Sequence, residues 1–274
     1  MTAVELLAAP QLSPGAYAAP RCSGSAGIRS GLACPVAFDL WVVDAVLPTG
    51  AELQWDRDHG DEAIAVLTGA VEIGGEDCPV DTVIVVEAGA LATLRASEPA
   101  TVVHFGGAHQ GARSRRDGRL PPGVHVIGPG PATGTRVAHP EGMVSAGYYL
   151  DSTCAGCDLT LLRTTGEGTV KGSSHSHSQH ELIRVLDGAL HFGPLVATAG
   201  TTAAIPADLR YAFRATARFA FLNYRAGPST ITKQRRPGAV RESADSLGWG
   251  DLGTRHVRIS INERSQAWEP LSTR

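Results

Sequence analysis

One stretch decides the fold of this chain, and it reads Gly172-Ser173-Ser174-His175-Ser176-His177-Ser178-Gln179-His180-Glu181. Side chains alternate between the two faces of a β-strand, so His175 and His177 point to the same side and can approach one ion. If the chain then turns and returns as a strand, Glu181 reaches that ion from the neighbouring strand. Two imidazoles and one carboxylate leave coordination positions open, as a redox-active divalent metal needs. The stretch therefore predicts a metal site formed by His175, His177 and Glu181.

The segment that follows Glu181 has a counterpart earlier in the chain. Glu181 is followed by six residues and then Gly188, and Glu62 is followed by six residues and then Gly69. The two glutamates lie 119 residues apart (181 − 62), a suitable length for one small barrel and a connection. Apolar runs that end in turn residues flank both copies. Short strands at this spacing are typical of an antiparallel barrel or jelly roll, so the chain is predicted to be a tandem duplication.

The composition agrees with short strands. The chain has 32 glycines, 17 prolines and only 19% charged residues, which favours strands joined by turns over long amphipathic helices. Its 274 residues are enough for two small domains of ~100–150 residues, each with its own core. We therefore expect an all-β protein.

The spacing of the metal stretch resembles that of a known family. His175-x-His177-x3-Glu181-x6-Gly188 is similar to the first motif of the cupin superfamily at every fixed position. The second cupin motif is met only in part, because Asp208 stands at its glycine and Tyr211 at its histidine, the family's fourth ligand. The resemblance implies two tandem cupin (jelly-roll) β-barrels with few short helices. It also makes Tyr211 the candidate catalytic residue.

The two copies differ in their metal-binding residues. Aligned on Glu62, the first copy has Asp56 and Asp58 where the second has histidines, and Ala92 where a further ligand would be. We therefore expect a degenerate, metal-free first barrel that serves packing and dimerisation. His180, next to Glu181, is a candidate spare ligand or a hydrogen-bond donor to the ligands.

The expected domain organisation follows the repeat. We predict an N-terminal metal-free cupin barrel (1–106), an inter-barrel linker (107–145), a C-terminal metal-binding cupin barrel (146–227) and a C-terminal extension (228–274). The linker is rich in Gly, Pro and Arg, with little periodicity. In the extension, residues 256–261 alternate like a strand that joins a sheet of either barrel.

The fold does not select a reaction, because cupins include oxygenases, decarboxylases, isomerases and binding proteins. Our leading hypothesis is a non-heme iron oxygenase or dioxygenase acting on a small organic molecule, with one divalent transition metal per chain. Fe(II) is favoured, and Mn(II), Ni(II), Co(II) and Zn(II) are alternatives. A second hypothesis is a redox-neutral Zn or Mn isomerase, cyclase or lyase in which Tyr211 donates or accepts a proton. A third is a non-catalytic small-molecule-binding bicupin.

Charge and cysteine content exclude several partners. A net charge of −3 gives no basic field for nucleic acid, and an unbroken apolar run of ~18 residues for a membrane span is absent. The N-terminus lacks a basic leader, so we expect a cytoplasmic protein, and we also expect a homodimer. Five cysteines argue against a fully paired disulfide framework. Cys154-x-x-Cys157 has the spacing of a zinc or redox site, with ordinary reduced thiols as the alternative.

Overall fold

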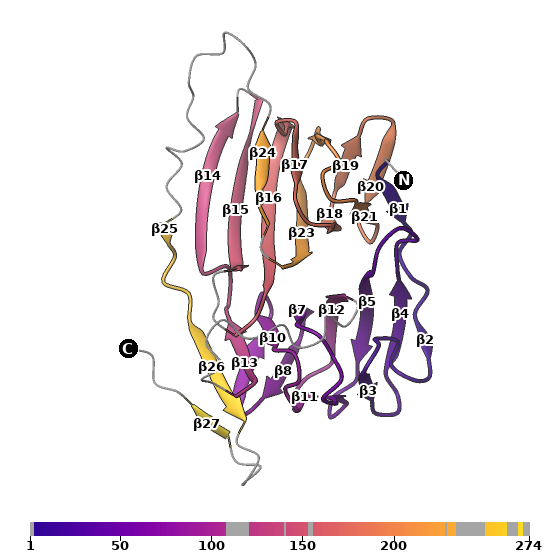
Figure 1. Cartoon of the computed structure of the whole chain (residues 1–274), viewed down its shortest axis with the longest axis vertical. Coiled ribbons are helices and arrows are strands. Elements are labelled where there is room, and N and C mark those ends of the chain that lie inside the picture. The colour runs from indigo at the N-terminus through magenta and orange to yellow at the C-terminus, as the bar shows by residue number, and fades with distance from the viewer. Residues whose placement is uncertain are drawn as a thin grey trace.

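The computed structural model describes residues 3–107, 121–139, 141–152, 156–227, 229–233, 250–261 and 268–270. These residues form strands, turns and irregular segments, and none of them is in a helix. Two stranded bodies lie one above the other in Figure 1. The prediction of an all-β fold with two barrels is confirmed. The described part of the chain contains no helix long and apolar enough to cross a membrane.

The first barrel consists of two antiparallel sheets that face each other. The larger sheet has the order β2 (Ser13–Pro14), β4 (Arg29–Ala33), β5 (Leu40–Leu47), β12 (Ala100–Gly107), β7 (Glu62–Thr68), β10 (Val83–Val86), β13 (Gly123–Ile127), β26 (His256–Ile261) and β27 (Trp268–Pro270). The smaller has the order β3 (Cys22–Gly24), β6 (Glu52–Trp55), β11 (Ala92–Ala96), β8 (Ala70–Ile73) and β9 (Glu76–Pro79). Leu47, Leu53 and Ile64 lie in the fully buried core between the sheets.

The second barrel repeats this arrangement with longer strands. Its main sheet has the order β1 (Glu5–Leu7), β21 (Thr202–Ile205), β18 (Glu181–Asp187), β23 (Phe219–Ala226), β16 (Leu159–Lys171), β15 (Glu141–Asp151), β14 (Thr133–His139) and β25 (Gly250–Asp251). The opposite side is formed by β19 (Ala189–Phe192), β20 (Leu195–Thr198) and β22 (Arg214–Ala215), and by the pair β17 (His175–His177) and β24 (Ile231–Lys233). Phe219 and Phe221 stack in its core.

The main sheets of the two barrels pack against each other and bury a third core. In β7, Ile64 faces the inside of the first barrel, whereas Ala63 packs against the second barrel. Phe105 and Tyr224, one from each barrel, stack with ring centroids 5.3 Å apart. Because both faces of these strands are buried, they read as continuous apolar runs and not as alternating ones.

The two barrels exchange terminal strands, so the predicted domain boundaries do not match the sheets. β1, at the start of the chain, pairs with β21 of the second barrel, and β26, from the C-terminal extension, pairs with β13 of the first (Figure 1). The segment 107–145 also differs from an irregular linker, because its described part contains β13, β14 and the start of β15. Strand pairing between distant segments overrides the local Gly and Pro content here.

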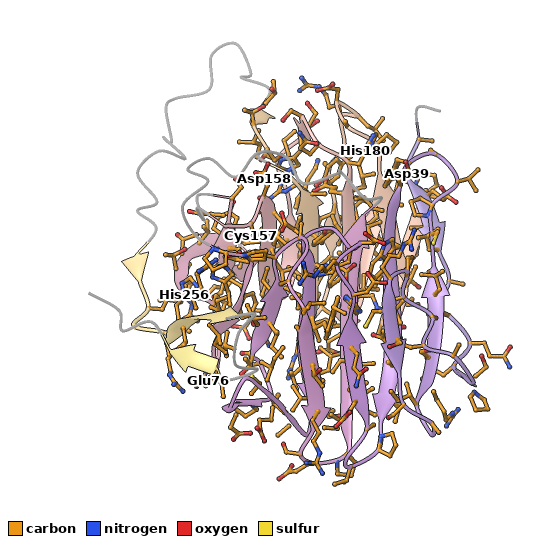
Figure 2. All side chains as sticks on the ribbon, turned by 60° about the horizontal axis from the view of Figure 1, so that its bottom comes forward. Asp39, Glu76, Cys157, Asp158, His180 and His256 are labelled. Atoms are coloured by element: carbon orange, nitrogen blue, oxygen red, sulfur yellow. The ribbon has the colours of Figure 1, made fainter. Side chains whose placement is uncertain are left out.

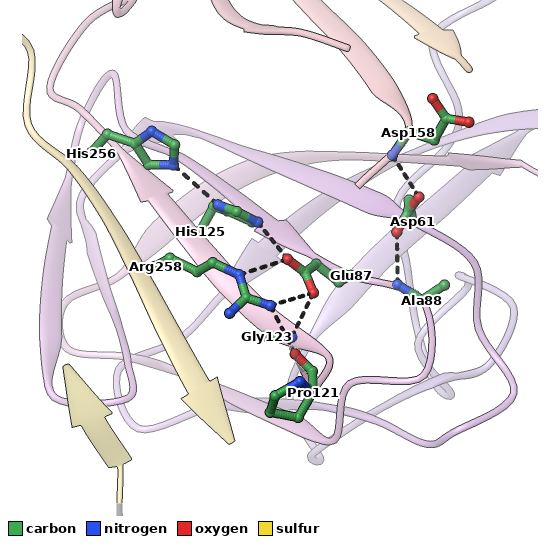
Figure 3. Close-up of polar contacts among 9 residues, drawn as sticks. All are labelled: Asp61, Glu87, Ala88, Pro121, Gly123, His125, Asp158, His256 and Arg258. Carbon is green, nitrogen blue, oxygen red and sulfur yellow. Dashed lines mark hydrogen bonds and ion pairs between the residues drawn. The ribbon is translucent and has the colours of Figure 1, made fainter. Parts of the chain in front are cut away.

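The docking of β26 uses a buried carboxylate, Glu87, which is 0% exposed (Figure 3). Arg258 donates two hydrogen bonds to it, of 2.9 Å to Oε1 and 2.8 Å to Oε2, and the backbone N–H of Gly123 donates another of 2.8 Å. His125 donates from Nε2 over 2.7 Å, and its Nδ1 lies 3.0 Å from Nε2 of His256. Burial favours the neutral acid, but the bonds from His125 and Arg258 outweigh it and lower the pKa of Glu87 to about 2.

The glycine that ends each repeat motif is required by its backbone conformation. Gly69 and Gly188 both have φ of +70°. A Cβ atom would lie 2.0 Å from the carbonyl oxygen of Pro99 at Gly69, and 2.1 Å from that of Arg218 at Gly188. A side chain is thus excluded at both positions by sterics as well as by dihedral angle.

Candidate metal centre

His175 and Tyr211 face each other at one end of the second barrel. Their backbones form an antiparallel bridge, with N···O distances of 3.0 and 2.9 Å. His175 Nδ1 lies 2.7 Å from the carbonyl oxygen of Ser173, which can only accept, so Nδ1 carries the proton. Nε2 faces the Tyr211 hydroxyl, 3.2 Å away. This tautomer leaves the Nε2 lone pair for a proton donor or a metal.

His177 and Glu181 lie beside this pair. The rings of His175 and His177 are 5.0 Å apart and nearly perpendicular. His177 Nε2 is 3.8 Å from Glu181 Oε2, and Glu181 is fully buried. The structure thus brings the predicted donors and Tyr211 to one end of the barrel.

Two further residues, Asn223 and Arg225, enter the site from β23, and neither was predicted from the sequence. Asn223 Nδ2 donates to Glu181 Oε2 over 2.8 Å. Arg225 pairs with Glu181 in the sheet register, and its NH1 lies 2.8 Å from Nδ1 and 3.0 Å from Nε2 of His177. The repeat offset contains a usable signal, because it aligns Asn223 with His104, which binds Glu62 in the first barrel.

The charges around the site set the protonation of its members. Burial, then Arg225 and then His175 lower the pKa of His177 to about 3, so its imidazole is neutral at pH 7. Burial and then the negative charge of Glu181 raise the pKa of Tyr211 well above its usual value, so its phenol keeps its proton. Arg225, 3% exposed, brings a positive charge within 3.9 Å of Glu181.

The donor chemistry fits a divalent cation. Glu181 Oε1 is buried without a hydrogen-bond partner among the described residues, as are Asn223 Oδ1 and Arg225 Nε. An unpaired carboxylate oxygen beside two histidine rings is a favourable place for a cation. The side chains do not yet converge on one point, because the described part of the chain holds no group of three His, Cys, Asp or Glu arranged to bind a metal. Arg225 NH1 instead contacts both ring nitrogens of His177.

His180 is turned away from this centre. Its Nδ1 accepts a hydrogen bond of 2.9 Å from the backbone of Ala207, and its ring stacks on Phe38 of the first barrel with centroids 4.3 Å apart. Figure 2 shows His180 close to Asp39, the residue after Phe38. His180 thus connects the turn of the second motif to the first barrel.

The other sequence candidates lie away from the centre. In the first barrel, Asp56 and Asp58 are exposed, and Asp56 Oδ1 accepts a hydrogen bond of 2.7 Å from the backbone of Asp58. Cys157 is buried in the core between the barrels. Cys154, its partner in the C-x-x-C pattern, lies outside the described residues.

Comparison with known proteins rests on structure alone. No protein-family model and no curated protein matches the sequence. Among solved structures, a deletion mutant of Bacillus subtilis oxalate decarboxylase superposes with a TM-score of 0.60 at 12% identity, over 91% of this chain and 88% of that one. The coconut allergen cocosin superposes with a TM-score of 0.59 at 9% identity, over 85% and 88%.

A further structure of the same decarboxylase, whose Mn(II) centres are the subject of that work, superposes with a TM-score of 0.56 at 14% identity, over 84% of each chain. These identities support a shared fold and no more. They agree with the duplicated motif, the repeated glycine and the two packed barrels described above. The chain is therefore a bicupin by fold, two cupin barrels in tandem.

Proposed function

We propose that this protein is a metal-dependent cupin enzyme that acts on a small organic acid at the centre formed by His175, His177 and Glu181. The observation that carries the proposal is Arg225, a buried cation in contact with His177. A divalent ion, one guanidinium and one carboxylate leave a net positive charge in a buried site. An anionic ligand compensates that charge, and arginine binds carboxylates through two parallel hydrogen bonds.

Each residue then has a defined task. His175, His177 and Glu181 hold the ion, and Arg225, once released from His177, orients the carboxylate of the substrate. Tyr211, whose phenol keeps its proton, donates a proton to the substrate. Asn223 holds the carboxylate of Glu181 in place. The ion supplies Lewis acidity and, if it is redox-active, electrons for reaction with dioxygen.

Two reaction classes fit this centre. The leading one is an iron(II) oxygenase or dioxygenase, because two histidines and one carboxylate leave positions open for both substrate and dioxygen. The second is a redox-neutral lyase or decarboxylase, which is favoured by a protonated Tyr211 beside the ligands and agrees with the name of the Bacillus subtilis neighbour. Dioxygen uptake during turnover separates the two classes.

The metal is tested by elemental analysis of protein purified without added metal. We expect close to one transition-metal ion per chain, and loss of that ion in the variant with both His175→Ala and His177→Ala. The matched control is His191→Ala, a histidine on β19 of the same barrel that is not among the proposed ligands. Full metal occupancy in the double variant would refute the ligand assignment.

The substrate class is tested with small mono- and dicarboxylic acids and their amides, monitoring dioxygen uptake and carbon dioxide release. We expect turnover of acids and not of amides, and a large rise in KM in Arg225→Met with smaller effect in Arg225→Lys. Equal KM values for Arg225→Met and the wild type would remove the carboxylate role of Arg225. Absence of turnover for every acid in the metal-loaded protein would favour a non-catalytic binding protein.

A further inference from the structure

The first barrel contains a cavity that the metal proposal does not use. It measures about 290 Å³ and opens near the loop that precedes β5. Its lining includes apolar and acidic side chains, among them Phe38, Leu40, Trp41, Asp39, Asp58 and Glu62. It occupies the end of the first barrel at which Glu62, the repeat counterpart of Glu181, begins its strand.

Glu62 forms a carboxylate floor for this cavity, and it is 2% exposed. Its Oε2 accepts hydrogen bonds from Trp55 Nε1 over 2.6 Å and from His104 Nε2 over 2.9 Å. The Tyr17 hydroxyl lies 3.0 Å from His104 Nδ1 and donates to it, which fixes the tautomer that donates to Glu62. Every bond found for Glu62 within the described residues uses Oε2. Its Oε1 therefore remains available to a donor in the cavity.

The walls are apolar and aromatic. Trp41 lies across Gly106, its partner in the sheet register, where a Cβ atom would come within 2.1 Å of the indole ring. Phe38 adds a second ring, held by its stack on His180. Aromatic faces attract cations, and they also shield a buried ion pair from water.

The rim adds charge of mainly one sign. Asp39 and Asp58 are exposed carboxylates at the rim, and Arg21 is the cation among the lining residues, apart from the His59 ring. Both nitrogens of His59 contact backbone carbonyl oxygens, at 2.6 and 2.8 Å, so His59 is already engaged. Three carboxylates outnumber Arg21 and the His59 ring, so acidic groups predominate around the cavity.

We propose that this cavity binds a small organic cation, a primary or secondary amine with a short hydrocarbon chain. The ammonium donates to Glu62 Oε1, and the hydrocarbon part lies against Trp41 and Phe38. The first barrel then keeps a binding function although it has lost the metal-binding histidines. This site is separate from the proposed metal centre and does not depend on it.

The test uses n-butylammonium as the probe, with butyrate and 1-butanol as controls of equal chain length. Binding is measured by calorimetry and by protection of Cys34, which is exposed and lines the cavity, against alkylation by iodoacetamide. Peptide mass mapping reads the modification of Cys34 separately from that of other thiols. We expect one butylammonium per chain, binding that weakens with added salt, and protection by butylammonium only.

Variants locate the probe. Glu62→Gln should weaken butylammonium binding roughly tenfold or more, because a charge-assisted hydrogen bond is lost. Because Glu62→Gln also disturbs Trp55 and His104, the double variant Asp39→Asn, Asp58→Asn at the exposed rim provides a second measurement, with an expected loss of roughly threefold to tenfold. Glu98→Gln, an exposed acid that does not line the cavity, is the matched control and should bind as the wild type does.

Three outcomes would overturn the proposal. The first is butyrate or butanol binding as well as butylammonium, which would make the cavity unselective for charge. The second is butylammonium affinity that is unchanged in the folded rim double variant. The third is the absence of any protection of Cys34 at saturating butylammonium, which would place the probe elsewhere.

Discussion

The hydrogen bonds that Glu87 accepts from Arg258, His125 and Gly123 give the sharpest test of how β26 is attached to the first barrel. The substitution Glu87→Gln keeps the shape of the side chain and removes its charge. It leaves Arg258 and His125 facing a neutral amide whose NH2 group cannot accept their hydrogen bonds. Because Arg258 lies on β26, the change loosens the attachment of that strand to Glu87, which follows β10, and so weakens its pairing with β13.

The magnitude follows from the pKa of Glu87. A fall from 4.5 to about 2 corresponds to about 3 kcal/mol of folding free energy at pH 7. This agrees with the ~3–5 kcal/mol typical of breaking a buried ion pair by removing one partner. The pKa in the folded protein lies below that in the unfolded chain. The stabilisation is therefore fully present above pH about 4.5, and it is lost progressively as the pH falls toward 2.

The assay is urea unfolding of wild type and Glu87→Gln at several pH values between 7 and 2.5. The matched control is Asp187→Asn, which removes an exposed ion pair with Arg218 and should cost at most ~1 kcal/mol. We expect a gap of about 3 kcal/mol between wild type and Glu87→Gln at pH 7, closing as the pH falls below about 4.5. A gap that is independent of pH, or one no larger than that of Asp187→Asn, would refute the reasoning.

Four further predictions follow from the fold and the site. In urea unfolding, Gly188→Ala should lower the free energy of unfolding by at least ~2 kcal/mol, because its Cβ meets a carbonyl oxygen. Gly193 has φ of +60° but open space around it, so Gly193→Ala should lower it by only ~1 kcal/mol. Equal losses in the two variants would contradict the steric argument. Asp208 has φ of +61° where the second motif has glycine, so Asp208→Gly should raise the free energy of unfolding by up to ~1 kcal/mol. The measurement is the thermal midpoint, which should rise; a lower midpoint would argue against backbone strain at Asp208. Tyr211→Phe should retain the metal and lose ~10²–10⁴-fold in turnover of whichever acid proves to be the substrate, and wild-type activity would show that the hydroxyl is idle. We propose that the chain is a homodimer in solution, and a monomeric mass by light scattering at micromolar concentration would exclude this.

The duplication and the local geometry of each motif could be predicted from the sequence, because they depend on neighbouring residues. The alternation of side chains brings His175 and His177 to one side, and it needs no knowledge of the rest of the chain. The positive φ of Gly69 and Gly188 belongs to the turn that ends each motif, whereas the carbonyl oxygens that also exclude a side chain there come from more distant residues of the same copy. The prediction of two barrels and the proposed set of metal ligands both rest on these local features.

What the tertiary structure decided depends on strands that pair across long distances in the chain. Arg225 reaches His177 only because β23 lies beside β18 in a register that sets Arg225 opposite Glu181. The N-terminal strand β1 joins the second barrel, and the C-terminal strand β26 joins the first. The backbone N–H and C=O groups at a sheet edge can pair with any strand that reaches them, however far away it lies in the sequence. The pattern of apolar and polar residues indicates which face of a strand is buried, but not which strand pairs with it. At this centre the neighbouring strand, β23, brings Arg225 and Asn223 to His177 and Glu181, and these contacts could not be predicted from the pattern.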